Sequence, residues 1–594
     1  MTAVADSVDD TLADDASRAW LDDLRDALRS GDAGRYEDLF DTDAWWRDLL
    51  AFTWDLRSLH GEDAIGPLMT TARGLSADGF TPADDMPPML IDTPGAPRMV
   101  QAFFDFRTAA GPGRGLVRLT PAAGGNGWRA VTLLTSLESL ADRDFAVGTR
   151  RPSGTPDPGA PSWSARRQAE QECSTGELDV LVVGAGHSGL GLAAYLGALG
   201  VSTLVIDKNE RVGDNWRRRY ESLVLHDPVW YDHMPLMKFP PGWPVFTPKD
   251  KMGDWLEIYS RAMELNVWTS SSIDTSSYDR SSARWLVRVD RDGESRELRP
   301  RHVVLATGLS GTEPLVPTFD GQDEFAGALM HSSEYTDGTS LSGKRVAVIG
   351  TGNSGHDVAQ DLHRHGANVT LVQRGPTFVV GAETVEAVMM SGSYSEHAPD
   401  TETSDLIGAS MPHRATATTA GLQQATAAMA ELDKEIHEGL TRRGFQLSSG
   451  VDGTGSMMLF LTRNGGYYID VGASQLIIDG EIGVVSGAGI DRLDRDGLRL
   501  NDGRRLDVDA VILATGFRGI VDTARRIFGD AVADAVGPVW DLDEEGELRG
   551  VWRSSGHDGF WFSGGNLGFA RLYNKYLALR LAAELTGVDT SAPI

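Results

Sequence analysis

Apolar and polar positions alternate in three segments between residues 99 and 139, and turns that contain Gly and Pro separate the segments. The segments are MVQAFFDFRTA (99–109), GLVRLTPA (115–122) and WRAVTLLTSLES (128–139), and their period of two predicts antiparallel strands. Upstream, WLDDLRDALRSGD (20–32) and YEDLFDTDAWWRDLLAF (36–52) carry apolar positions at helical spacing. Helices followed by a meander predict a small α+β domain over residues 1–148.

This first domain resembles the NTF2-like (SnoaL-like) cone fold in the phrases DAWWRDLLAFTWDL (43–56) and GEDAI (61–65). The curved sheet of such a fold could enclose a pocket. We nevertheless expect Trp45, Trp46 and Trp54 to fill a core, because large aromatic side chains are more often core than ligand wall. Residues 149–176 are rich in Pro, Gly and Ser and are predicted to be a linker.

The segment LDVLVVGAGHSGLGLAAYLGALGVSTLVID (178–207) predicts a buried strand, a G-x-G-x-x-G turn, a helix and a second strand that ends in an acid. Gly184 permits the tight turn, Gly186 lets the backbone approach a pyrophosphate, and Gly189 lets helix and strand pack closely. The helix N-terminus offers free N–H groups to phosphates. Asp207 stands at the spacing expected for a bond to ribose hydroxyls, so the segment predicts a dinucleotide site.

A second segment of the same kind is KRVAVIGTGNSGHDVAQDLHRHGANVTLVQRG (344–375), in which Gly350, Gly352 and Gly355 take the same three places. Its second strand ends in Gln-Arg instead of an acid. A carboxylate there would repel a 2′-phosphate, whereas the guanidinium of Arg374 can bind one through paired hydrogen bonds. The pattern favours NADPH as the second cofactor and leaves NADH open.

Two apolar strands end in Ala-Thr-Gly: RHVVLATG (301–308) precedes the second nucleotide segment and DAVILATG (509–516) follows it. This arrangement predicts that one nucleotide-binding domain (340–502) is inserted within another (177–339 and 503–594). The expected fold class is therefore α/β, with two nested Rossmann-like domains that face each other across a cleft, preceded by the small α+β domain.

Composition narrows the class of protein further. A formal charge of -30 over 594 residues argues against a nucleic-acid partner and against an anionic membrane surface. The single cysteine, Cys173, excludes an internal disulfide, a C-x-x-C pair and a cysteine zinc site. The sequence predicts no membrane span, no signal peptide and no metal site, so we expect a cytoplasmic protein that acts on a small molecule. The sequence leaves open whether the protein forms a homodimer.

With these segments in hand, residues 177–594 resemble the flavin-containing monooxygenases among the class B flavoprotein monooxygenases. The resemblance rests on GAGHSG, GTGNSG, LATGF (513–517), GDNWRRRYESLVLHDP (213–228) and FAGALMHSSEY (325–335). The last matches the family fingerprint F-x-G-x-x-x-H-x-x-x-[YF], through Phe325, Gly327, His331 and Tyr335. An N-terminal extension is also what type II members of the family carry, and these include enzymes that oxidise ketones to esters.

The resemblance implies FAD and NADPH as cofactors and assigns residues to them. The expected cofactor-binding residues are Gly184, Gly186, His187, Ser188, Gly189, Asp207, Lys208, Asn215, Trp216, His226, Thr307, Gly308, Gly350, Gly352, Asn353, Ser354, Gly355, Arg374, Thr515 and Gly516. Two histidines are candidate catalytic residues. His226 stands where many members have an Asn beside the reacting edge of the flavin, and His331 is expected to organise the domains more than to transfer protons. Gly327 is expected to supply an unusual backbone angle.

The activity implied by the resemblance is NADPH- and O₂-dependent monooxygenation through a C4a-(hydro)peroxyflavin, with a nitrogen or sulfur centre of a small molecule as the favoured target. Baeyer–Villiger oxidation of ketones to esters is one alternative, and an NAD(P)H flavin reductase or oxidase without oxygen insertion is another. A helical insertion (381–460) includes GLQQATAAMAELDKEIHEGLTRRG (421–444), whose apolar face would comprise Leu422, Met429, Leu432, Ile436 and Leu440. The insertion could cap a substrate cavity or form an oligomer contact.

Overall fold

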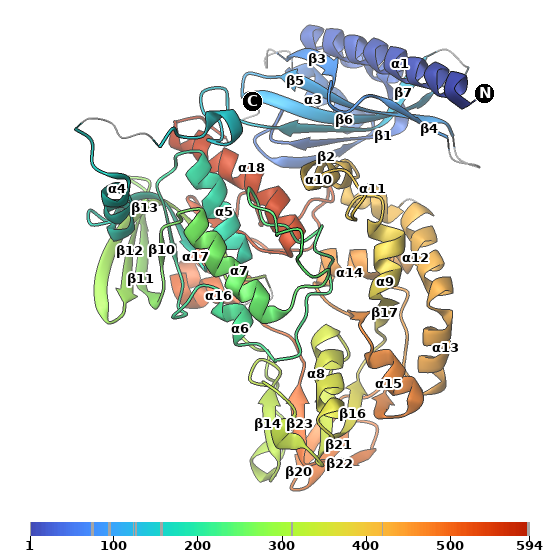
Figure 1. Ribbon diagram of the computed structural model, residues 1–594, viewed down its shortest axis with the longest axis vertical. Coiled ribbons are helices and arrows are strands. Elements are labelled where there is room, and N and C mark those ends of the chain that lie inside the picture. The colour runs from blue at the N-terminus through green and yellow to red at the C-terminus, as the bar shows by residue number, and fades with distance from the viewer. Residues whose placement is uncertain are drawn as a thin grey trace.

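The computed structural model describes residues 2–72, 77–92, 97–122, 124, 127–154, 159–309, 313–418 and 420–590 (Figure 1). Residues 155–158 of the predicted linker lie outside this range; its later part contains α4 (Trp163–Glu172). The N-terminal α+β domain lies at the top of Figure 1, the first nucleotide unit at the left, the second at the bottom and the helical insertion at the right. In the described parts of the chain, no helix is both long and apolar enough to cross a bilayer.

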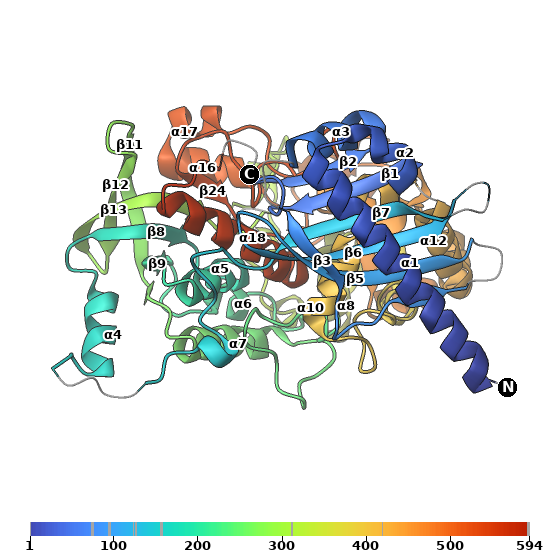
Figure 2. The same ribbon diagram turned by 90° about the horizontal axis from the view of Figure 1, so that it is seen from above.

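The N-terminal domain is a sheet in the order β2-β1-β7-β6-β5-β3, with β4 paired to β5. Its strands are β1 (Phe40–Leu49), β2 (Leu56–His60), β3 (Asp78–Pro82), β4 (Met89–Ile91), β5 (Met99–Arg107), β6 (Pro112–Pro121) and β7 (Trp128–Leu137). The helices are α1 (Thr2–Ser30), α2 (Tyr36–Leu39) and α3 (Glu62–Thr71). The long α1 packs across the sheet at β3, β4 and β5, as Figure 2 shows from above. The three predicted strands are confirmed, and the resemblance to the NTF2-like fold stays a prediction.

The prediction of a helix over 36–52 is wrong beyond Leu39, because residues 40–49 form the strand β1. Pairing with two neighbours decides the outcome, since β1 runs parallel to β7 and antiparallel to β2. The Asp48 carboxylate fixes the turn that follows by accepting the backbone N–H groups of Phe52 and Thr53. Trp46 and Trp54 are buried in the core as expected, whereas Trp45 is only partly buried.

The first nucleotide unit is built on the parallel strands β10-β9-β8-β13, with β24 on the far side of β13. The strands are β8 (Glu177–Val183), β9 (Thr203–Ile206), β10 (Val267–Trp268), β13 (Glu294–Leu305) and β24 (Phe560–Phe562). The strands β11 (Ser271–Asp279) and β12 (Arg284–Arg291) extend the sheet in antiparallel fashion. Helix α5 (His187–Ala198) packs against α18 (Leu567–Leu585), while α6 (Asp214–Arg217), α7 (Lys249–Ala262), α16 (Ile520–Phe528) and α17 (Asp530–Ala535) complete the unit.

The second nucleotide unit is a parallel sheet in the order β14-β23-β15-β16-β19. Its strands are β14 (Ala328–His331), β15 (Arg345–Ile349), β16 (Asn368–Gln373), β19 (Ile482–Ser486) and β23 (Ala510–Leu513). Helix α8 (Asn353–Arg364) follows the second glycine turn, and β20 (Ile490–Asp494), β21 (Gly497–Leu500) and β22 (Arg505–Asp507) form a small antiparallel sheet. β14 and β23 pair in this sheet although both lie outside the predicted bounds of 340–502.

The insertion begins with β17 (Phe378–Gly381), which pairs in parallel with β18 (Tyr467–Asp470), and α9 (Ala382–Val385). It continues through α10 (Thr401–Ala409), α11 (His413–Thr418), α12 (Ala420–Leu432), α13 (Lys434–Arg442), α14 (Gly455–Arg463) and α15 (Ala473–Asp479). The helix predicted over 421–444 is therefore two helices that break at Asp433. Leu432, expected on the apolar face, is 63% exposed because it lies at this break, whereas Leu422, Met429 and Leu440 are buried.

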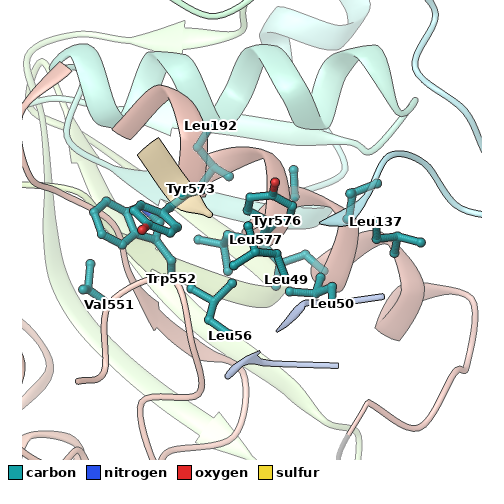
Figure 3. Packing of buried hydrophobic residues seen from close by; sticks show 14 of the residues in the cluster. Leu49, Leu50, Leu56, Leu137, Leu192, Val551, Trp552, Tyr573, Tyr576 and Leu577 are labelled. Carbon is teal, nitrogen blue, oxygen red and sulfur yellow. The ribbon is translucent and has the colours of Figure 1, made fainter. Parts of the chain in front are cut away.

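One sheet face of the N-terminal domain docks against the first nucleotide unit. Figure 3 shows leucines of the N-terminal domain in one apolar cluster with Leu192 and with side chains of α18 and the segment before β24. Beside the cluster, Arg47 and Glu547 form an ion pair with both side chains buried, and Lys575 pairs with Glu138. Because apolar and ionic contacts are both extensive here, the domain is an integral part of the molecule and not an appended module.

Candidate functional site

A cavity of about 420 Å³ runs along the first glycine turn. We name it the cradle cavity, and its lining includes Gly184, Gly186, His187, Ser188, Asp207, Lys208, Asn215, Thr307 and Gly308. All of these are residues that the sequence predicts to bind a cofactor. Gly189 and Trp216, which were also predicted, do not line this cavity: Gly189 lies inside α5, and Trp216 lines the neighbouring cavity described below.

Close packing explains the glycines of both cradles and the repeated Ala-Thr-Gly. Gly184 has a φ of 111°, and a Cβ atom there would stand 2.6 Å from the carbonyl oxygen of Ala306 in the first Ala-Thr-Gly turn. Gly350 repeats this with a φ of 115° and the carbonyl oxygen of Ala514 in the second turn. A Cβ atom at Gly189 would overlap the carbonyl oxygen of Gly184. Each Ala-Thr-Gly turn therefore packs directly against the first glycine of one cradle, where any side chain would push it away.

Polar groups of the cradle are held in fixed positions by the backbone. Asp207 accepts the backbone N–H groups of Ala185 and Asn209 at 2.7 and 2.8 Å, which places its carboxylate at the rim of the glycine turn. His187 Nε2 donates to the carbonyl oxygen of Gly565 at 3.0 Å, and burial lowers the pKa of this histidine. His187 is therefore neutral near pH 7 and bridges α5 to the segment before α18.

Several buried polar atoms around the cavities have no hydrogen-bond partner within the described residues. They include Thr307 Oγ1 and Thr523 Oγ1 in the cradle cavity, Trp216 Nε1 and His226 Nδ1 in the cavity beside it, and Arg219 Nε between the two. Unsatisfied buried donors and acceptors are rare in native proteins and mark places where a ligand or water completes the site. Their position along the cradle fits a long polar cofactor.

A groove of about 980 Å³ follows the second glycine turn, and we name it the second-cradle groove. Its lining includes the predicted residues Gly352, Asn353, Ser354, Gly355, Arg374, Thr515 and Gly516. Gly350 lies behind it, against Ala514. Arg374 is exposed, and the neighbouring Gln373 is buried, with its amide bonded to the backbone of Gln446. Arg463, which sequence reasoning missed, also lines the groove.

The fingerprint segment ties the second Ala-Thr-Gly turn to the second sheet. His331 is 1% exposed; its Nε2 donates to the carbonyl oxygen of Gly516 at 3.0 Å, and burial lowers its pKa. The Tyr335 hydroxyl donates to Asp361 of α8 at 2.5 Å. Phe325 is partly buried and packs with an apolar cluster of the second unit. In this conformation His331 is therefore a neutral, enclosed connector.

The expectation of an unusual backbone angle at Gly327 is wrong, since its φ does not lie in the left-handed region. The reason for glycine is space. A Cβ atom at this position would stand 2.5 Å from both the carbonyl oxygen of Asp509 and the ring of Phe325. The segment can therefore approach Asp509, the residue just before β23, only where the side chain is a hydrogen atom.

A third cavity, of about 360 Å³, lies between the two nucleotide units and the insertion, and we name it the central cavity. Within it, His226 Nε2 stands 3.5 Å from Asp357 Oδ2 of α8, and the Tyr220 hydroxyl donates to the same oxygen at 2.7 Å. Burial acts to lower the pKa of His226, but Asp357 outweighs burial and holds that pKa above its ordinary value. Burial raises the pKa of Asp227, which also lines the cavity.

The rest of the central cavity is largely apolar. The insertion contributes Val385, Met389, Met390, Leu422, Met429, Met457 and Phe460, and α18 contributes Phe569. The insertion therefore caps a cavity, which is one of the two alternatives that its sequence left open. A concave, mostly apolar site with a few convergent polar groups is typical of a small-molecule site.

Arg219 joins the three cavities, because it lines the cradle cavity, the central cavity and the second-cradle groove. Its guanidinium stands over the ring of Tyr220, 5.7 Å from the ring centroid. Sequence reasoning missed Arg219, Tyr220 and Asp357. The run RRRY in residues 217–220 predicts a cation near the site, but it does not predict that Arg219 is the arginine that lines all three cavities.

Comparison with known proteins adds sequence relatives. Residues 178–392 match the pyridine nucleotide-disulphide oxidoreductase family. The indole-3-pyruvate monooxygenase YUCCA1 of Oryza sativa subsp. japonica is 32% identical over 373 residues, which are 61% of this chain and 82% of that protein. The probable indole-3-pyruvate monooxygenase YUCCA9 of Arabidopsis thaliana is 31% identical over 343 residues, 57% of this chain and 75% of that protein. Enzymes that reduce disulphides use a pair of cysteines, and this chain has one cysteine, Cys173, which lies in the linker. The family match therefore reflects the nucleotide-binding fold and not disulphide chemistry.

Solved structures share the fold at lower identity. The open crystal structure of cyclohexanone monooxygenase superposes with a TM-score of 0.50 at 18% identity, over 69% of this chain and 89% of that one. OTEMO in complex with FAD and NADP superposes with a TM-score of 0.51 at 19% identity, over 69% of this chain and 86% of that one. These similarities support a shared fold for the two nucleotide-binding units.

Proposed function

Because the chain belongs to the flavin-dependent monooxygenase family, we propose that it holds FAD along the cradle cavity and NADPH along the second-cradle groove, and inserts an oxygen atom of O₂ into a small molecule in the central cavity. The observation that carries the proposal is the position of Arg219, at which all three cavities meet. Two cofactors and a substrate that share one meeting point can exchange electrons and oxygen there.

The residues present fit the two cofactors. For FAD, the backbone at Gly184 and Gly186 leaves room for a pyrophosphate, Asp207 stands at the rim for ribose hydroxyls, and Thr307 Oγ1 lacks a partner that a ligand would supply. For NADPH, the exposed guanidinium of Arg374 stands at the end of β16, where a 2′-phosphate is bound in such folds. Arg463 on the same groove adds a second cation.

The chemistry that a flavin supplies when bound is acceptance of a hydride and activation of O₂, which no amino-acid side chain provides. The chain itself supplies the cation Arg219 and a histidine, His226, whose pKa is raised by the neighbouring Asp357. Preorganised positive groups favour the negative charge that develops at a reacting oxygen. The apolar side chains of the insertion limit the access of water to the same place.

For the substrate, we propose an aromatic 2-oxo acid. Two relatives are named as indole-3-pyruvate monooxygenases, and indole-3-pyruvate is a compound of this class. The methionine and phenylalanine side chains of the central cavity suit an aromatic body, while Arg219 and His226 suit a carboxylate. A second candidate is the nitrogen or sulfur centre predicted from the sequence. Asp227 favours it for amines, because its carboxylate could pair with an ammonium group.

Product analysis tests the proposal. The purified full chain, loaded with FAD, would be supplied with NADPH and ¹⁸O₂ together with phenylpyruvate, N,N-dimethylbenzylamine or thioanisole. We expect phenylacetate that carries one ¹⁸O atom, because the bond between the carbonyl and carboxylate carbons breaks and CO₂ leaves while the second oxygen atom becomes water. We expect little oxygenation of the other two compounds. Oxygenation of the amine or the thioether alone would instead support the second candidate. Release of one hydrogen peroxide per NADPH with every compound would contradict a monooxygenase and favour an oxidase.

A further inference from the structure

A fourth cavity, of about 940 Å³, lies between the N-terminal sheet and the insertion, and we name it the junction cavity. Strands β1, β2, β6 and β7 contribute Trp45, His60, Arg118 and Thr132, the turn before α11 contributes Met411, and the start of α11 contributes Arg414. It shares no lining residue with the central cavity among the parts of the chain described. It is therefore a separate space, formed only because the N-terminal domain docks on the insertion.

Arg118 differs from the other buried arginines of the molecule. Arg47, Arg118, Arg571 and Arg580 are the arginines buried in the described ranges. Arg47 pairs with Glu547, Arg571 with Asp405, and Arg580 with carboxylates at 3.4 and 3.5 Å. Arg118 is 8% exposed, yet none of the carboxylates described forms an ion pair with it. A buried charge without a counter-charge is strongly unfavourable, so a partner is expected.

The hydrogen bonds of Arg118 leave part of its guanidinium available. Its Nε donates to Gln101 at 3.0 Å, and its Nη1 donates to Ser410 at 2.8 Å and to Thr132 and Met411 at 3.4 Å. These acceptors are all neutral. Within the described residues its Nη2 donates no hydrogen bond, and the residue lines the cavity. Burial without a carboxylate lowers the pKa of Arg118 to about 10, so the group is still a cation near neutral pH.

The remaining walls define what kind of anion would fit. Trp45 stacks on His60 with ring centroids 4.2 Å apart, and Leu59, Met99 and Val131 add apolar surface. The acidic groups of the lining are at the rim or already paired: Asp43 is exposed, the Glu544 side chain is 93% exposed, and Glu545 pairs with Arg57. An anion deep in the cavity would therefore meet Arg118 while its body lies against aromatic and aliphatic side chains.

We propose that the junction cavity is a binding site for a small organic carboxylate with an aromatic body, whose carboxylate group pairs with Arg118. The site is additional to the proposed active site and does not depend on it. Its ligand would contact the turn between α10 and α11 through Met411, next to Ser410, which bonds Arg118. This segment leads into α12, which caps the central cavity. Occupancy of the junction cavity is therefore expected to order that part of the cap.

Isothermal titration calorimetry on the FAD-loaded full chain tests the proposal with two matched probes, 2-naphthoate and its neutral amide, 2-naphthamide. We expect saturable binding of 2-naphthoate, and binding of the amide at least roughly tenfold weaker, since a charged pair in a buried site contributes at least about 1.4 kcal/mol. Absence of saturable 2-naphthoate binding up to its solubility limit, or equal affinity for the two probes, would overturn the proposal.

Variants locate the binding. Arg118→Met is expected to weaken 2-naphthoate binding about tenfold or more and to leave the amide unchanged. Arg107→Met, an exposed arginine on β5 that does not line the cavity, is the matched control and should bind like the unmodified protein. Trp45→Ala should weaken both probes, and it decides the question if Arg118→Met does not fold. Unchanged affinity for 2-naphthoate in either of the two cavity variants, if folded, contradicts the assignment.

Hydrogen exchange provides an independent measurement that separates this site from the proposed active site. Binding of 2-naphthoate should slow amide exchange in residues 409–418, next to Arg118. Protection confined to residues 385–390 and 422–429 would place the probe in the central cavity and would overturn the proposal, while leaving the proposed monooxygenase function intact.

Discussion

Arg47 of the N-terminal sheet and Glu547 of the first nucleotide unit form a doubly hydrogen-bonded ion pair, with Nε to Oε1 at 2.7 Å and Nη2 to Oε2 at 2.8 Å. Both side chains are fully enclosed, and Arg47 also donates to the carbonyl oxygen of Ala409 at the end of α10. Burial acts to raise the pKa of Glu547, but the charge of Arg47 and its hydrogen bonds outweigh burial and lower that pKa to about 2. One guanidinium thus connects three parts of the molecule.

Breaking this pair on one side should be costly. We expect Arg47→Met to lower the free energy of unfolding by about 3–5 kcal/mol, because Glu547 would remain buried without a counter-charge. Arg47→Met combined with Glu547→Leu should recover part of the loss. Denaturant midpoints of the FAD-loaded chain measure both effects. Arg18→Ala, which breaks the exposed pair with Asp14, is the control and should change stability by no more than about 1 kcal/mol.

The His226–Asp357 contact should make stability depend on pH. The folded-state pKa of His226 is raised, so the pair contributes its full stability below the unfolded pKa of about 6.5 and loses it as the pH rises through the folded pKa. We therefore expect the stability difference between the unmodified protein and His226→Gln to be largest at acidic pH and to shrink at alkaline pH. Denaturant midpoints between about pH 5 and 8 measure it. A difference that does not vary with pH would assign His226 to packing.

Arg374 should determine the preference between the two nicotinamide cofactors. We expect Arg374→Ala to raise the KM for NADPH about 10- to 100-fold, the equivalent of roughly 1.4–2.8 kcal/mol, and to leave the KM for NADH nearly unchanged. Initial rates of cofactor oxidation give both values. Arg345→Ala, which removes an exposed arginine of the same unit that pairs with Asp509, is the matched control. Equal effects of Arg374→Ala on both cofactors would defeat the assignment to a 2′-phosphate.

Two glycines of the same helix, α5, allow a test of the cradle packing. Gly189→Ala would place a methyl group against the carbonyl oxygen of Gly184, so we expect it to abolish or strongly reduce FAD content in the purified protein. Gly197→Ala, with no atom within 4 Å of the added carbon, should retain full FAD content. It should stabilise the helix by about 0.5–1 kcal/mol. The ratio of flavin to protein absorbance measures both, and normal FAD content in Gly189→Ala would contradict the packing argument.

The sequence predicts those parts of this molecule in which neighbours along the chain determine the structure. The two glycine turns, the strands that flank them and the Ala-Thr-Gly turns are local patterns with a geometric cause, and the fold confirms two nucleotide-binding units. The alternating strands of residues 99–139 belong to the same class, because their period of two is a property of each segment by itself.

Long-range contacts account for what the sequence did not predict. Residues 40–49 carry a pattern compatible with a helix, and pairing with β2 and with β7, which is far along the chain, makes them a strand. The sequence predicts only that Asp357 lies in a helix. Its contact with His226 depends on how the first and second nucleotide units face each other. Arg219 is one of three successive arginines, and its position between cavities follows from the turn after α6. Site residues that depend on such long-range contacts cannot be predicted from the spacing of residues in the sequence.

The break between α12 and α13 has a consequence for how the specificity of this chain could change. Asp433, at the break, accepts the backbone N–H of Gly381 at 2.7 Å and the Thr384 hydroxyl at 2.6 Å, so residues 381 and 433 are fastened together. The largely helical segment between them is thus held together at its two ends. A replacement segment between these two anchors would have to keep the contacts of Asp405 with Arg571 and of Ala409 with Arg47. With those contacts kept, the wall of the central cavity could change in shape while the sheets outside the segment stay in register.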